Sequence, residues 1–113
     1  MITPRTLFLF VLISIAKSTY AQTAPAVLWQ VTAGGTLDDY GASICTLPDG
    51  ESIVVGSTSS QDGDSFGNHG MLDILVLRLG SNGVLQWRAV YGGGANEGGY
   101  AVEWGGEDGI VVM

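Results

Sequence analysis

The chain contains an internal repeat, in which residues 29–55 recur in similar form at 87–112, and this repeat restricts its fold more than any other feature. The matches that stay in step are Trp29 with Trp87, Gly34-Gly35 with Gly92-Gly93, Asp38-Asp39 with Asn96-Glu97, and Ile44 with Val102. Slightly out of step, the turn at 49–50 recurs at 108–109 and the apolar segment 53–55 recurs at 110–112. Such self-similarity predicts stacked copies of one supersecondary unit.

Short apolar segments separated by tight turns predict an all-β chain. Glycine supplies 18 of the 113 residues, against an average share of about 7%. Pro48-Asp49-Gly50 and Asn82-Gly83 are turn sequences, because proline fixes one φ and glycine accepts a positive one. The segment 72–79 is apolar almost throughout, which is typical of a strand buried on both faces. The predicted strands are 27–32, 40–47, 52–57, 72–79 and 84–90.

Four antiparallel strands per unit, with the inner strands covered on both faces, fit the blades of a β-propeller. We therefore predict four-stranded antiparallel blade-like repeats that form a fragment of a propeller. The expected units are a first β-repeat over residues 22–84 and an incomplete second β-repeat over residues 85–113. Trp29 and Trp87 are the expected packing anchors between blades, and ligand stacking is the alternative role for these two rings.

The N-terminus predicts a signal peptide over residues 1–21. Arg5 supplies positive charge before an apolar run over residues 7–16, which is too short to cross roughly 30 Å of hydrocarbon as a helix. Thr19-Tyr20-Ala21 resembles a small-x-small cleavage site, so cleavage is expected before Gln22. An uncleaved membrane anchor is the alternative, and no membrane span is expected after cleavage. The chain is expected to be exported, to the extracellular space, the cell surface or the periplasm.

The chain that remains after cleavage is strongly acidic. Arg78 and Arg88 are set against eleven Asp and Glu residues, for a net charge of −9. Such a chain repels phosphate backbones, so no nucleic-acid partner is expected. Cys45 is the one cysteine, which excludes an internal disulfide. Its apolar neighbours indicate a small buried side chain rather than a nucleophile.

The polar loop before segment 72–79 carries the candidate metal ligands. Asp62, Asp64, Asn68 and Asp73 place hard oxygen atoms near one another in the sequence, and Ca²⁺ prefers such ligands. The spacing lacks the third acid, the glycine and the final glutamate of an EF-hand loop. An ordinary polar connection is therefore the alternative. His69, the one histidine, is expected to be a turn residue, because a transition-metal site needs more His or Cys ligands.

No arrangement of residues in the sequence selects a catalytic site. The glycine-rich segment 92–97 fails as a phosphate loop, because it contains Glu97 and no lysine follows. A triad of Ser57, His69 and an aspartate can be drawn, but nothing singles out its members, and no nucleophile elbow is present. Since Asp38-Asp39 and the polar pair at 96–97 recur in both units, we predict that they are turn residues. No enzymatic activity and no cofactor are expected.

The order of these motifs resembles a known repeat family. The residues that carry the resemblance are Trp29–Gly35, Asp39–Ile44, Pro48-Asp49-Gly50, Ile53–Gly56, Asp62-Gly63-Asp64, Gly67–Gly70, Asp73–Val76, Asn82-Gly83 and Gln86-Trp87. Together they are similar to the SBBP-type β-propeller repeats of secreted and surface proteins in Bacteroidetes and related bacteria, over residues 28–112. The resemblance implies a β-propeller, export and often a C-terminal sorting domain of the type IX secretion system.

The resemblance and the signal peptide together predict an exported, non-enzymatic repeat protein that serves as a binding scaffold for a protein or glycan partner. The alternative is an accessory repeat module of a larger exported hydrolytic enzyme. Because family members carry many tandem units, further repeats of the same chain are expected beyond Met113. If none follow, the apolar segment 110–112 leaves an unpaired edge and the short chain is expected to associate.

Overall fold

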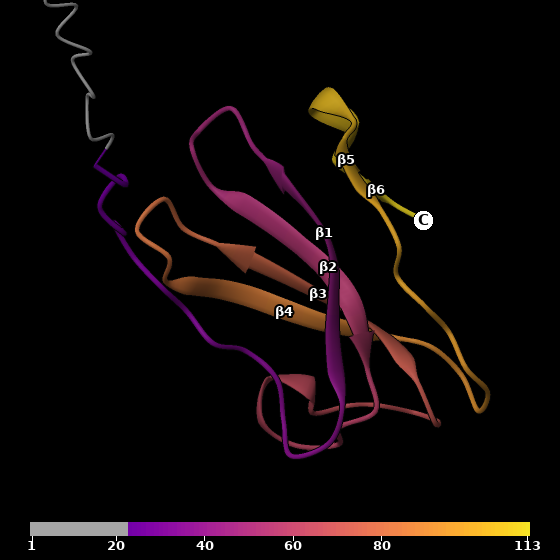
Figure 1. The fold of residues 1–113 in the computed structure, drawn as a ribbon. Coiled ribbons are helices and arrows are strands. Elements are labelled where there is room, and N and C mark those ends of the chain that lie inside the picture. The colour runs from indigo at the N-terminus through magenta and orange to yellow at the C-terminus, as the bar shows by residue number, and fades with distance from the viewer. Residues whose placement is uncertain (1–22) are drawn as a thin grey trace, which may run out of the picture.

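The computed structural model describes residues 23–113, apart from the side chain of Asp108, so the predicted signal peptide lies outside the described residues. These residues form one four-stranded sheet and one hairpin (Figure 1). They contain no α-helix, and no helix among them is long and apolar enough to cross a membrane. The elements are β1 (Asp39–Thr46), β2 (Ser52–Thr58), β3 (Asp73–Leu79), β4 (Leu85–Tyr91), β5 (Val102–Trp104) and β6 (Ile110–Val112), with short 3₁₀ turns at Gly63–Ser65 and Gly106–Asp108.

The sheet follows the chain, with strands in the order β1-β2-β3-β4 and every neighbouring pair antiparallel. Tight turns produce this order: the N–H of Gly50 donates to the carbonyl of Leu47 at 3.0 Å, and that of Gly83 donates to Gly80 at 2.9 Å. Both Gly50 and Gly83 adopt a positive φ, which residues with a side chain disfavour. Four of the five predicted strands are confirmed to within one residue at each end.

One face of the sheet, here called the hairpin face, is covered by the β5–β6 hairpin. Ile53, Val55 and Val76 from the sheet and Val102 from β5 are each 4% exposed or less. The N–H of Val102 donates to Ser43 Oγ at 3.4 Å, which ties the hairpin to β1. Burial of such aliphatic side chains contributes about 1.5–3 kcal/mol each. The partly buried side chains around this core are Cys45, Ile74, Ile110 and Val112.

The opposite face, here called the N-terminal face, is crossed by the N-terminal segment, residues 23–38 (Figure 1). The strand predicted over residues 27–32 is wrong, because no part of it pairs with a strand among the described residues. The position beside β3, which the repeat predicts for this segment, is already filled. β3 pairs with β2 on one side and with β4 on the other, and β4 is the counterpart of this segment in the second copy of the repeat. The segment therefore finds no ladder there and lies across the sheet.

The pairing of β5 with β6 has the same register as the pairing of β1 with β2, one repeat further along the chain. A backbone hydrogen bond closes each turn, from Leu47 to Glu51 at 2.8 Å and from Gly105 to Gly109 at 2.7 Å. The matched strand pairs are Ile44–Val54 with Val102–Val112, Cys45–Ile53 with Glu103–Val111, and Thr46–Ser52 with Trp104–Ile110.

The sheet does not follow the boundaries of the sequence units. Its four strands span residues 39–91, so the boundary expected between residues 84 and 85 falls between β3 and β4 of one sheet. The pairing register also aligns β6 with residues 52–54, and not with 53–55 as the sequence match suggested. Both differences arise because the backbone hydrogen bonds set which residues of two strands lie opposite each other. Matching residue types along the sequence does not determine this register directly. Residues 23–113 by themselves form neither a closed barrel nor a propeller ring.

Candidate functional site

The acids of the loop between β2 and β3 hold the N-terminal segment in place. Asp62 Oδ1 accepts the N–H of Thr36 at 2.8 Å and the hydroxyl of the same residue at 3.2 Å. Asp64 Oδ2 accepts the N–H of Gly34 at 3.2 Å, and the N–H of Asp64 donates to the Gly34 carbonyl at 3.0 Å. Two of the predicted calcium ligands are therefore hydrogen-bond acceptors for the chain itself.

Asn68 and Asp73 lie where β2 ends and β3 begins. Asn68 Nδ2 donates to the carbonyl of Thr58 at 2.9 Å, and Asn68 Oδ1 accepts the N–H of Gly70 at 2.8 Å. Asp73 is fully buried, and its Oδ2 accepts the N–H of His69 at 2.7 Å and lies 3.3 Å from His69 Nδ1. The other oxygen, Oδ1, is buried and has no hydrogen-bond partner among the described residues. His69 lies in the loop before β3, and most of its side chain is exposed.

The four residues predicted for calcium contact different parts of the chain: Asp62 and Asp64 contact the N-terminal segment, whereas Asn68 and Asp73 contact residues at the end of β2 and before β3. Within residues 23–113, no group of three or more His, Cys, Asp or Glu side chains is arranged to hold a metal ion. Ca²⁺ takes about six to eight oxygen ligands, whereas several oxygens of these side chains already accept hydrogen bonds. Calcium binding by this loop stays a prediction, and the function proposed below does not depend on it.

Asp39 joins three segments of the chain beside this loop. Its carboxylate accepts the N–H of Gly35 at 2.7 Å and the hydroxyls of Ser60 and Ser65, each at 3.0 Å; the hydroxyl of Thr58 donates to it as well. Burial alone would raise the pKa of Asp39, but the hydrogen bonds outweigh burial and hold the pKa below its ordinary value. The carboxylate is therefore favoured in its charged form.

The hydrogen bond between Asp39 and Gly35 has a counterpart in the second hairpin region. The N–H of Gly93 donates to Glu97 at 3.1 Å, with the same spacing of four residues along the chain. Asp39 and Glu97 are the acids that recurrence in the sequence marked as turn residues. Their contacts agree with that prediction, since each carboxylate closes a local turn on a glycine N–H.

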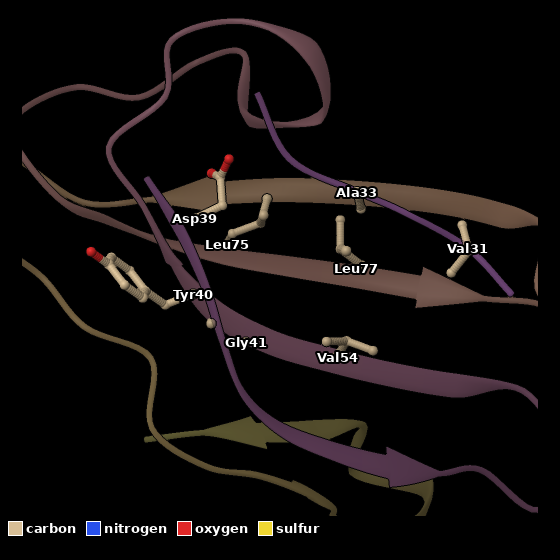
Figure 2. Close-up of a pocket in the computed structure, with 9 residues that line it drawn as sticks. Val31, Ala33, Asp39, Tyr40, Gly41, Val54, Leu75 and Leu77 are labelled. Carbon is tan, nitrogen blue, oxygen red and sulfur yellow. The ribbon is translucent and has the colours of Figure 1, made fainter. Parts of the chain in front are cut away.

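A groove of about 210 Å³ lies on the N-terminal face, where the N-terminal segment passes over β2 and β3 (Figure 2). Val31 and Ala33 of the segment stand over Leu75 and Leu77 of β3, and Asp39 lies toward one end. The remaining lining residues are Tyr40, Gly41, Val54 and Gly56. Because the walls are mostly aliphatic and Asp39 is occupied by four donors, this groove offers few polar atoms to orient a small ligand.

A second hollow, here called the edge cleft, lies on the hairpin face beside β6 and has a volume of about 310 Å³. Trp87 and Tyr91 remain 39% and 56% exposed in it. The walls of the edge cleft come from strands that are distant in the sequence, so the sequence analysis did not find it. The recurrence of a tryptophan at position 87 was the one sequence signal that pointed to this place. The lining residues are Ile74, Val76, Trp87, Tyr91, Ile110 and Val112.

The two tryptophans that recur in the sequence have different surroundings. Trp87 stands in β4 beside the edge cleft, between the sheet and the hairpin. Trp29 lies outside the sheet and packs on the turn after β3, where a Cβ added to Gly83 would lie 2.5 Å from Trp29 Cε3. That Trp29 and Trp87 act as packing anchors between blades therefore stays a prediction. No family model, curated protein or solved structure matches this chain.

Proposed function

We propose that the chain is part of an exported, non-enzymatic binding scaffold, built from stacked four-stranded β units of the propeller type, whose partner is a protein or a glycan. The observation that carries the proposal is the common register of β1–β2 and β5–β6, two strand pairs that lie one repeat apart in the sequence. The packing of the second hairpin on the hairpin face adds support, because blades of a propeller stack face to face in this way.

The loops at the ends of the strands are the surfaces that such a scaffold offers to a partner. The loop between β2 and β3 is held by Asp62 and Asp64 on one side and by Asn68 on the other, so its backbone is positioned by the fold. Phe66 in this loop is 70% exposed. Binding residues are often found on loops that a rigid scaffold positions, and a glycan or protein surface can contact an exposed aromatic ring.

The test applies two measurements to the purified chain. Binding to fixed bacterial cells is expected to be saturable; protease treatment of the cells removes the binding if the partner is a protein, and periodate oxidation removes it if the partner is a glycan. Fluorogenic ester, glycoside and peptide substrates are expected to show no turnover above buffer. Turnover that disappears when the chain is unfolded would overturn the non-enzymatic role, and failure to saturate would overturn the scaffold role.

A further inference from the structure

We propose that Asn82, in the turn between β3 and β4, is a site of spontaneous covalent modification, at which the side-chain amide is lost and aspartate or isoaspartate forms. Asn82 is exposed in this turn, and glycine follows it at position 83. The reacting groups are the side chain of Asn82 and the backbone nitrogen of Gly83, and the co-reactant is water. The modification goes beyond the binding role and does not depend on it.

The reaction has two steps, and neither needs an oxidant or a reductant. In the first step the nitrogen of Gly83 attacks Cγ of Asn82 and closes a succinimide ring. The bond from Cγ to Nδ2 breaks, and the amide group leaves as ammonia with the proton of the Gly83 nitrogen. In the second step water opens the ring. Opening at the side-chain carbonyl gives aspartate, and opening at the main-chain carbonyl gives isoaspartate.

The hydrogen bond between Asn82 and Val84 prepares the side chain for this attack. Asn82 Oδ1 accepts the N–H of Val84 at 3.1 Å. An asparagine that bonds the backbone two residues later folds its side chain back along the intervening peptide, which turns Cγ of Asn82 toward the Gly83 nitrogen. As the attack places negative charge on Oδ1, the N–H of Val84 is already in position to stabilise that charge.

Two contacts of Gly83 slow the reaction in the folded chain. The N–H of Gly83 donates to the carbonyl of Gly80 at 2.9 Å, and this bond has to open before the nitrogen can attack. Gly83 is also buried, because Trp29 of the N-terminal segment packs on it: a Cβ added to Gly83 would lie 2.5 Å from Trp29 Cε3. The ring of Trp29 therefore protects the turn from modification.

The other two asparagines of the chain, Asn68 and Asn96, are in less reactive surroundings. After Asn68, the N–H of His69 donates to the buried carboxylate of Asp73 at 2.7 Å. A negatively charged acceptor opposes the loss of the proton that the attack requires. After Asn96, the N–H of Glu97 donates to a backbone carbonyl at 2.6 Å. Both following residues also carry side chains that crowd the nitrogen, which position 83 lacks.

Formation of isoaspartate changes the turn on which Trp29 rests. Isoaspartate carries the main chain through the former side chain and lengthens it by one methylene group. Gly83 then cannot keep both its hydrogen bond to Gly80 and its contact with Trp29, because the turn was closed around a shorter chain. Trp29 is therefore expected to leave the turn. Aspartate adds a negative charge at position 82 but keeps the length of the backbone.

The test incubates the purified chain in mildly alkaline buffer and follows each asparagine by peptide mass spectrometry, since exchange of the amide for a carboxyl group raises the mass. Conversion is expected at Asn82 before Asn68 or Asn96, with two products that separate by chromatography. In NMR spectra, the indole N–H resonance of Trp29 is expected to move in the isoaspartate fraction. The variant Asn82→Asp is expected to leave this resonance in place, because it adds the charge without lengthening the backbone.

Three further variants test the geometry. Val84→Pro removes the N–H that bonds Asn82 Oδ1 and is expected to slow conversion about tenfold, whereas Val84→Ala keeps this N–H and is expected to convert at the wild-type rate. Trp29→Ala uncovers Gly83 and is expected to convert faster. Equal rates in the two Val84 variants, or earlier conversion at another asparagine, would overturn the proposal. Because the comparison of asparagines uses the unaltered chain, it decides the matter even if the proline variant does not fold.

Discussion

Asp39 shows how a single carboxylate can hold a turn, a strand end and a loop together. Its donors come from the N-terminal segment (Gly35), from the end of β2 and the residues after it, and from the loop that follows (Ser65). The pKa of Asp39 is lower in the folded chain than the value of about 3.9 expected when unfolded. Its contribution to stability is therefore complete above about pH 4 and is lost as the pH falls through the folded-state pKa.

The variant Asp39→Asn is expected to lower the free energy of unfolding by about 1–2 kcal/mol at pH 7, because a neutral amide accepts fewer and weaker hydrogen bonds. The matched control is Asp38→Asn: the main-chain carbonyl of Asp38, and not its side chain, accepts from Ser59, so a change below about 0.5 kcal/mol is expected. Urea unfolding at pH 7 and pH 3 checks both. A gap between wild type and Asp39→Asn that does not narrow at pH 3 would contradict the assigned role of the charge.

At the scale of elements, the backbone of β1 leaves no room for a side chain at Gly56 of β2. Their register shifts between Gly41 and Ser43, which places a bulge in β1. A Cβ added to Gly56 of β2 would overlap the carbonyl oxygen of Tyr40. Position 56 therefore requires glycine because the backbone of Tyr40 is too close for a Cβ. The φ angle of Gly56 does not impose this requirement.

Gly56→Ala is expected to destabilise the chain by about 2–3 kcal/mol, because the clash is with main-chain atoms that the ladder holds in place. Gly41→Ala is the matched control on the facing strand, since an added Cβ there meets nothing within 4 Å. Chemical denaturation followed by fluorescence compares the two variants. Equal losses of stability in both would show that the β1–β2 approach is looser than described.

Local signals explain which strands could be predicted and which could not. The turns at Pro48-Asp49-Gly50 and Asn82-Gly83 bound their neighbouring strands by their own conformational preferences, so β1 to β4 were found from the sequence. Whether residues 27–32 pair depends on whether the side of β3 that the repeat predicts for them is free, which is a property of the assembled sheet. The edge cleft was missed for the same reason, because it exists only when β6 lies beside Trp87 and Ile74.

At the scale of the whole molecule, stability depends on the contact between two layers. Val102 is 4% exposed and packs with Val55 and Val76 of the sheet. The hairpin has only two short strands of its own, and an isolated two-stranded hairpin is at best marginally stable in water. The sheet therefore holds the hairpin, and residues 23–113 are expected to unfold as one unit.

Val102→Ala is expected to lower the free energy of unfolding by about 2 kcal/mol, through lost burial and the small cavity that remains. Val111→Ala, on the same hairpin but 52% exposed, is expected to cost less than about 0.5 kcal/mol. Amide exchange and a denaturation curve check this together. Exchange in β5 and β6 that is much faster than in β2, with the sheet unaffected by Val102→Ala, would show that the layers unfold separately.

The unpaired N-terminal segment has a consequence for how the chain responds to proteases. Leu28 is 91% exposed in extended backbone that belongs to no strand, whereas Trp87 lies within a paired strand. Exposed chain near a terminus is the preferred place for proteolytic nicking. A protease that cuts after large apolar residues is therefore expected to cut at Leu28 before it cuts within the sheet or near Gly34, whose N–H donates to Asp64 Oδ2. Limited proteolysis is therefore expected to trim this segment while the four-stranded sheet stays intact.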